Sequence, residues 1–201
     1  MTNQMMCRIV TGLLATTLFM TCGCGSTAPS RFYILQSHPS IGEALQAADS
    51  GSGAVIGVGP VEMPDYINRP QMVTRINRQE LKLSEFNRWA ETLEKNFSRV
   101  LAENLSELLS TDNVLVYPWA GTVKVERQVE VHVIQFNGRP GGDVLLKAHW
   151  SLTGNDGKDL LLMKKSQFSA PAGQEYSEMV EAMNRVLAEF SREIATAMKG
   201  R

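Results

Sequence analysis

Two histidines in the second half of the chain come nearest, by type and spacing, to a metal-binding arrangement. If the Phe136–Leu145 hairpin pairs symmetrically, His132 lies opposite His149 on its polar face. Cross-strand neighbours have Cβ atoms about 5 Å apart, and Glu130 could add a carboxylate. The same face is the one that a half-buried hairpin turns to water, so we interpret these side chains as surface residues. We predict no metal site and no cofactor.

Motifs typical of catalysis are missing from the sequence. Gly51-Ser-Gly53 lacks the pattern of a nucleophile elbow, and Gly57-Val-Gly59 lacks the third glycine of a dinucleotide site. There is no phosphate-binding loop, no His-Glu-x-x-His and no cysteine cluster. With three histidines in the whole chain, a Ser-His-Asp triad has few ways to form. We therefore predict that the protein is not an enzyme.

The densest group of constrained and polar residues is the segment 59–75. Its three prolines fix the backbone and remove hydrogen-bond donors: Pro60, Pro64 and Pro70. Its polar side chains include Asp65, Tyr66, Arg69 and Arg75. One interpretation is a stiff recognition segment, since Tyr and Arg are frequent at interface hot spots. The other is a rigid crossover whose side chains pack locally, with Asp65 paired to Arg69 or Arg75.

The N-terminus has the pattern of a secretory signal followed by a lipid-attachment cysteine. Arg8 precedes a 12-residue apolar run, Ile9–Met20, which is too short to span a bilayer as a helix. The lipoprotein signal peptidase requires a small residue before the modified cysteine, and Gly23 supplies it for Cys24. We predict a signal peptide over residues 1–23 and lipid attachment at Cys24, with Cys22 as the less favoured alternative.

Cysteine usage agrees with this processing. Cys7 and Cys22 leave with the signal peptide and Cys24 is acylated, so the mature protein keeps no free thiol. Several acyl chains would give a stable membrane anchor. Gly25 follows the lipid site, where inner-membrane retention typically uses Asp, so outer-membrane sorting is favoured. Residues 24–30 form a small, polar tether.

Hydrophobic periodicity predicts eight strands and two helices. Apolar residues at steps of three and four indicate helices over 88–109, with Ser84 or Asn87 as the cap, and over 175–199. Alternating or β-branched runs indicate strands over residues 31–36, 54–59, 72–77 paired with 80–84, 114–117, 125–136, 143–153 and 160–169. The segment 38–53 is expected to be an exposed loop.

The two helices must bury their apolar stripes against a sheet with one apolar face. We therefore predict a single α+β domain over 31–201, with an antiparallel or mixed sheet and both helices packed on one face. Trp150 alternates in step with Leu146, Ala148 and Leu152, which places it on the helix-covered face.

Charge excludes one class of partner. The formal net charge is −1 and no basic block stands out, so the sequence predicts no nucleic-acid binding. The same even distribution gives no support for polybasic attraction to anionic lipid. Homo-oligomerisation is left open.

Four segments carry a family resemblance, with Pro64-Asp-Tyr-Ile-Asn-Arg-Pro-Gln71 the most specific part. The segments are Cys24–Tyr33, Gly57–Arg75, Arg88–Glu91 and Tyr117–Trp119. Together the chain resembles the PqiC family, the ABC-type transport auxiliary lipoproteins, over essentially the whole mature sequence. Thr21 departs from the Leu common at that position before the lipid site, which bears on cleavage efficiency.

The resemblance implies a role but no catalytic residues. It implies an outer-membrane lipoprotein that works with periplasm-spanning mammalian-cell-entry (MCE) domain proteins and their inner-membrane permease in intermembrane lipid transport and membrane integrity. In that role the chain would act as a tethering and binding module. The alternative is an assembly or plug lipoprotein for an outer-membrane barrel, a class that also places helices on a small sheet.

Overall fold

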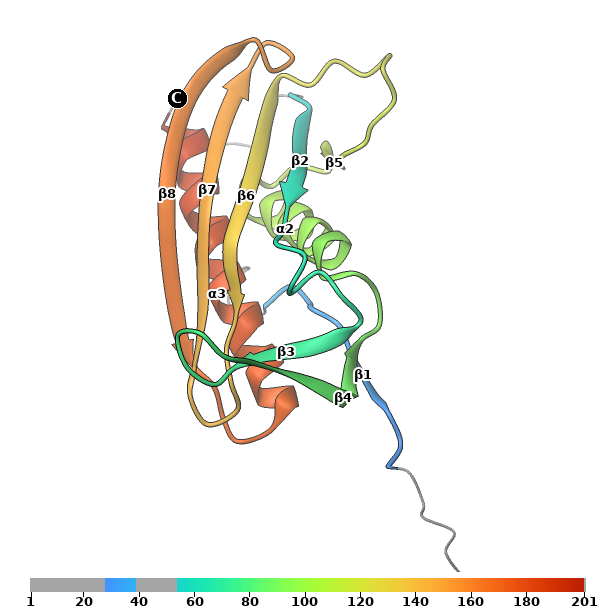
Figure 1. Cartoon of the computed structure of the whole chain (residues 1–201). Helices are drawn as coiled ribbons and strands as arrows, with labels where there is room; N and C mark the ends of the chain where they lie inside the picture. Colours follow the sequence, from blue (N-terminus) through green and yellow to red (C-terminus); the bar gives the residue numbers. More distant parts are fainter. Residues whose placement is uncertain (1–27, 39–53, 201) are drawn as a thin grey trace, which may run out of the picture.

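The computed structural model describes residues 28–38 and 54–200, so the predicted signal peptide, Cys24 and most of the predicted loop 38–53 lie outside the described residues. Figure 1 shows two helices lying behind a tall, twisted sheet, with a smaller sheet beneath. The elements in chain order are β1 (Arg31–Tyr33), β2 (Ile56–Glu62), β3 (Gln71–Arg75), β4 (Leu81–Trp89), α2 (Leu93–Leu109), β5 (Val114–Val116), β6 (Arg127–Asn137), β7 (Asp143–Gly154), β8 (Asp159–Pro171) and α3 (Tyr176–Lys199).

The larger sheet is mixed and has five strands in the order β5-β2-β6-β7-β8. β2 runs parallel to both β5 and β6, whereas β6, β7 and β8 form an antiparallel meander. Both helices pack on one face of this sheet (Figure 1). The predicted α+β architecture, with a mixed sheet covered on one face by two helices, is confirmed.

A separate three-stranded sheet, in the order β1-β4-β3, is the feature that the sequence did not predict. β1 pairs parallel to β4, and β3 and β4 form the predicted antiparallel hairpin. This small sheet lies at the lower end of the molecule in Figure 1, where the described chain begins. The residues between β2 and β3 therefore connect a strand of the large sheet to a strand of the small one.

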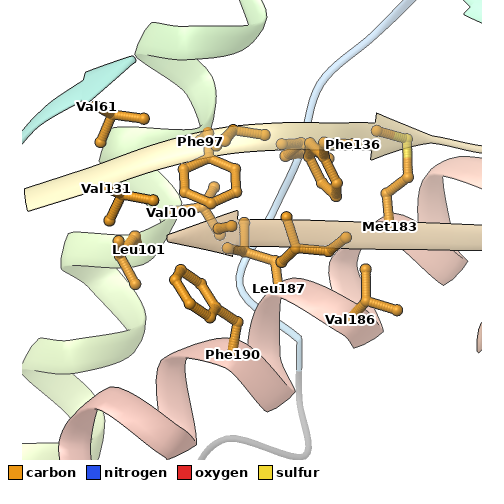
Figure 2. Packing of buried hydrophobic residues seen from close by; sticks show 14 of the residues in the cluster. Val61, Phe97, Val100, Leu101, Val131, Phe136, Met183, Val186, Leu187 and Phe190 are labelled. Atoms are coloured by element: carbon orange, nitrogen blue, oxygen red, sulfur yellow. The ribbon is translucent and has the colours of Figure 1, made fainter. Parts of the chain in front are cut away.

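Aromatic and aliphatic side chains from three layers meet between the helices and the large sheet. Figure 2 shows Phe97 of α2, Phe136 of β6 and Phe190 of α3 pointing toward one another. The rings of Phe97 and Phe136 are 5.4 Å apart and edge-on, and those of Phe97 and Phe190 are 6.2 Å apart. Because every one of these side chains is fully buried, this contact fixes both helices on the sheet.

The predicted pairing of His132 with His149 in the β6–β7 hairpin is confirmed. Nearer the turn the pairing is not the predicted one, because an irregularity between Val133 and Gln135 pairs Phe136 with Leu146 instead of Leu145. Val131 pairs with Trp150, and His132 pairs with His149. Val131 and Trp150 face the helices and are buried, while the two histidines are exposed on the other face. The predicted burial of Trp150 under the helices is confirmed.

The predicted start of the first helix at residue 88 is wrong. Arg88 and Trp89 end β4, and α2 begins at Leu93 after the N-cap Thr92. The Trp89 N–H donates to the Pro70 carbonyl at 2.8 Å, which holds this residue in the sheet. Ser84 and Asn87 therefore do not cap the helix; the Ser84 hydroxyl instead accepts from the backbone and side chain of Asn87 within β4.

The strand predicted over 31–36 ends at Tyr33, because the following residues are held by the helices instead of a neighbouring strand. The Leu35 side chain is fully buried, and its carbonyl accepts from Arg99 of α2 at 3.2 Å. The Gln36 N–H donates to Asn184 of α3 at 3.1 Å. The strand predicted over 54–59 instead continues to Glu62.

Candidate functional site

The centre of the proline-rich segment is a tight turn between β2 and β3. The Pro64 carbonyl accepts from the backbone N–H of Ile67 at 3.0 Å and of Asn68 at 3.2 Å. Ile67 is only 2% exposed, so its apolar side chain packs in the core and holds the turn in place. Pro70 then leads into β3. The prolines and the buried anchor together give a segment with a single fixed backbone shape.

Three of the four predicted binding residues lie on this turn. Asp65 is exposed, Tyr66 is half-buried with its ring against the core, and Arg69 is half-buried. Arg69 Nε is buried and has no hydrogen-bond partner among the described residues. Arg75 lies apart from these three, at the far end of β3.

The intramolecular pairing considered for Asp65 is not formed. Within residues 28–38 and 54–200, no ion pair joins Asp65 to Arg69 or Arg75. Asp65 itself is exposed. In the described structure the crossover is therefore not held together by this pair of charges.

Asn68 makes the contact of this turn that sequence reasoning missed. Its Oδ1 accepts from the backbone N–H of Glu94 at 3.3 Å, and its Nδ2 donates to the Glu94 carboxylate at 2.9 Å. The N-cap residue itself, Thr92, makes no side-chain cap hydrogen bond. Asn68 therefore caps the start of α2 from 26 residues away in sequence.

Arg75 lines a different feature, a surface hollow of about 340 Å³ between two hairpin turns. One turn joins β3 to β4 and the other joins β6 to β7. The Arg75 N–H donates to the Gly138 carbonyl at 3.2 Å, which holds the two turns together. The residues lining the hollow are Arg75, Ile76, Asn77, Arg78, Gln135, Asn137, Gly138, Arg139, Asp143 and Leu145.

The two histidines line another hollow, of about 240 Å³, on the outer face of the large sheet. His132 Nδ1 lies 3.0 Å from a carboxylate oxygen of Glu62, and the two side chains are 63% and 70% exposed. Glu130, His149 and Met163 also line this hollow. Across the described part of the chain, no three His, Cys, Asp or Glu side chains are placed to hold a metal ion. These residues form a solvent-facing surface of mixed polar and apolar character.

None of the helices in the described ranges combines the length and the apolar character needed to cross a membrane. Cys24, the predicted lipid-attachment residue, precedes residue 28, where the described chain begins.

The fold is shared with proteins of solved structure. An uncharacterized protein that is 22% identical superposes with a TM-score of 0.69, covering 85% of this chain and 99% of its own. A protein from Xanthomonas campestris that is 12% identical superposes with a TM-score of 0.64, covering 85% of this chain and 96% of its own. The chain is thus an α+β domain of an established fold.

Sequence comparison gives the family. The ABC-type transport auxiliary lipoprotein components match residues 33–195, and this chain belongs to that family. Intermembrane transport lipoprotein PqiC of Escherichia coli (strain K12) is 25% identical over 178 residues, which cover 88% of this chain and 91% of the relative. PqiC of Shigella flexneri gives the same values. The family recognised from the sequence is confirmed.

Proposed function

We propose that this chain is the outer-membrane lipoprotein subunit of an intermembrane lipid-transport system, in which it tethers and binds a periplasm-spanning MCE-domain protein. That protein would connect it to an inner-membrane permease. The observation that carries the proposal is the similarity to PqiC over 88% of this chain, because that relative is an intermembrane transport lipoprotein. Lipid attachment at Cys24 would supply the outer-membrane anchor.

The 64–70 turn is the proposed docking site. Its backbone is fixed by Pro64, Pro70 and the buried side chain of Ile67, so little conformational entropy is lost when a partner binds. Asp65 presents an exposed carboxylate, Tyr66 presents part of its ring, and Arg69 carries a donor without a partner in the described structure. These are the side-chain types that combine contact area with directed hydrogen bonds.

Substitution of Arg75 tests how far the proposed docking surface extends beyond the 64–70 turn. Arg75 is separated from the 64–70 turn by the length of β3, so one compact partner surface cannot contact both without also covering that strand. A binding loss on substitution of Arg75 would show that the surface runs along β3. Normal binding would confine it to the turn.

The test is to replace Tyr66, Arg69 and Arg75 singly by Ala and measure capture of the purified MCE-domain partner together with thermal stability. We expect Tyr66→Ala or Arg69→Ala to weaken binding by about 2 kcal/mol or more with near-native melting. Tyr117→Ala, which removes a tyrosine that is 52% exposed beside β5, is the matched control and should bind normally. If every variant binds normally, or if each loss follows a loss of stability, the turn is only a structural crossover.

A further inference from the structure

The hollow between the β3–β4 and β6–β7 turns gathers positive charge that the fold does not neutralise. Arg75, Arg78 and Arg139 line it, against a single carboxylate, Asp143. Among the residues that the structure describes, none of the three guanidinium groups lies within 4.0 Å of a carboxylate. The hollow therefore has an excess of cationic groups in a chain whose formal net charge is −1.

The donors in this hollow are held in place by the two turns. Arg75 Nη1 donates to the Arg78 carbonyl at 3.2 Å, while its buried Nε has no partner in the described structure. The Asn77 Oδ1 accepts from the N–H groups of Gln79 and Glu80 at 2.9 Å, which closes the β3–β4 turn. Because the backbone of the turns is already ordered, a ligand that engages these guanidinium groups costs side-chain entropy but no ordering of the backbone.

Arg139 is held from the other side. Its carbonyl accepts from the Gly142 N–H at 3.1 Å, and a Cβ atom on Gly142 would meet the Arg139 side chain at 2.6 Å. Gly141 has a φ of +71°, a conformation that glycine adopts without strain. The β6–β7 turn is thus shaped so that the Arg139 side chain packs over Gly142.

Planar guanidinium groups bind phosphate oxygens through paired, charge-assisted hydrogen bonds. The hollow also has an apolar border, since Ile76 is 46% exposed and Leu145 is half-buried. In Figure 1 the two turns that border the hollow lie at the lower left of the molecule, and the described chain begins at the lower right. Three residues lie between Cys24 and residue 28, so the two are at most about 15 Å apart.

We propose that this hollow binds the phosphate group of a phospholipid headgroup, held by Arg75, Arg78 and Arg139 with Ile76 and Leu145 against the adjoining glycerol and acyl carbons. The phosphate site itself is independent of the proposed function; its assignment to a lipid rests on that function. Free phosphate has the same charged group without the apolar part, so the two ligands can be separated by experiment.

The experiment uses the full mature lipoprotein in a neutral detergent, titrated by calorimetry at constant ionic strength. The probes are dihexanoyl phosphatidylglycerol below its micellar concentration, inorganic phosphate, and dihexanoylglycerol, which lacks the phosphate. We expect the phospholipid to bind more tightly than either of the other two. The double variant Arg78→Gln/Arg139→Gln should weaken it by about tenfold or more, because both side chains are exposed and lose charged contacts without disturbing the core.

Lys158→Gln is the matched control, since it removes one positive charge at the β7–β8 turn, the opposite end of β7, and should bind the phospholipid normally. Equal binding by the double variant and the wild type, or equal binding of dihexanoylglycerol, would overturn the proposal. If inorganic phosphate binds as tightly as the phospholipid and needs the same arginines, the lipid assignment is overturned. Capture of the MCE-domain partner, compared between the wild type and the Tyr66 and Arg69 variants, tests the proposed function separately. Failure of that function can therefore be distinguished from failure of phospholipid binding.

Discussion

At the scale of single residues, Trp150 joins the large sheet to α3 through both its ring and its indole N–H. The ring is 2% exposed and meets Phe190 edge-on at 6.3 Å. Nε1 donates to the Ser166 hydroxyl of β8 at 2.9 Å, and that hydroxyl also contacts the Glu193 carboxylate of α3. Lys164 Nζ completes the cluster, 2.7 Å from Glu193. One residue therefore contributes to packing and to a polar connection between layers.

Trp150→Ala is expected to lower the free energy of unfolding by about 3–5 kcal/mol, because it leaves a large cavity beneath α3 and removes the donor to Ser166. Urea denaturation followed by circular dichroism measures the change. Trp150→Phe keeps most of the apolar volume and should cost markedly less. A loss below about 1 kcal/mol for the Ala variant would contradict the packing described for this face.

At the residue scale, the sequence predicted burial correctly where a single hydrophobic periodicity determines which face of a strand is covered. The alternation in β7 placed Trp150 on the covered face because a strand repeats every two residues. The contact with Glu193 could not be predicted, since it depends on how α3 lies across the sheet. For the same reason Arg78 and Arg139 were missed: their proximity follows from the contact between Arg75 and Gly138.

At the scale of elements, α2 depends on a residue outside itself. Its N-cap, Thr92, makes no side-chain cap hydrogen bond, whereas Asn68 accepts from the Glu94 N–H and donates to its carboxylate. Asn68→Ala is therefore expected to lower the free energy of unfolding by about 0.5–2 kcal/mol. Thermal and urea unfolding measure it. Thr92→Ala is the matched control and should be close to neutral; the reverse order would show that Thr92 is the functional cap.

The hydrogen bonds between Asn68 and Glu94 connect the proposed docking turn to α2. Because Asn68 belongs to the 64–70 turn, the start of α2 and the shape of the turn stabilise each other. A sequence search for caps examines residues adjacent to the helix, so a cap supplied from 26 residues away escapes it. The helix start was misplaced at residue 88 because Trp89 fits the apolar stripe of a helix as well as the buried face of β4.

Whether each of the other segments is a helix or a strand could be predicted from the sequence. Which strands share a sheet could not. The existence of both helices and the pairing of His132 with His149 in the β6–β7 hairpin followed from periodicity and turn residues. The division into two sheets could not be predicted, because hydropathy gives no information on which strands pair across long separations. Residues 34–36 were predicted as part of a strand, yet Arg99 and Asn184 hold Leu35 and Gln36 against the two helices.

The Arg99 guanidinium is also part of a charged cluster on α2. Burial lowers the pKa of Arg99, but hydrogen bonds and charge attraction from Glu103 and Glu91 outweigh it, and the net effect raises the pKa above its ordinary value. Arg99 Nη1 lies 2.8 Å from the Glu103 carboxylate. Arg99 therefore stays charged at all physiological pH values and links the chain after β1 to α2.

At the scale of the whole molecule, membrane attachment is predicted to depend on one residue. Cys24→Ala should release the protein from the membrane or leave its signal peptide uncleaved, because Cys24 is the predicted site of both lipid attachment and signal cleavage. Membrane fractionation with mass spectrometry of the N-terminus measures both outcomes. Cys22→Ala is the control and should remain acylated at Cys24. A membrane-bound Cys24→Ala protein carrying lipid on Cys22 would contradict the assignment.

The arrangement of the molecule gives each candidate surface its own position. The small sheet lies at the lower end of the molecule in Figure 1, where the described chain begins. The arginine-lined hollow lies between the β3–β4 and β6–β7 turns, and the His132 hollow lies on the outer face of the large sheet. The docking turn connects β2 of the large sheet with β3 of the small one. A protein anchored at its N-terminus could thus contact lipid at one end and a partner along its side.

The most direct test of the central claim is purification of the tagged lipoprotein from native membranes under mild detergent, with identification of the proteins that remain bound. We expect recovery of an MCE-domain protein together with an inner-membrane permease. Recovery should fall with Tyr66→Ala or Arg69→Ala but not with Tyr117→Ala. Recovery of an outer-membrane barrel in place of the MCE-domain protein would contradict the account and favour an assembly or plug role.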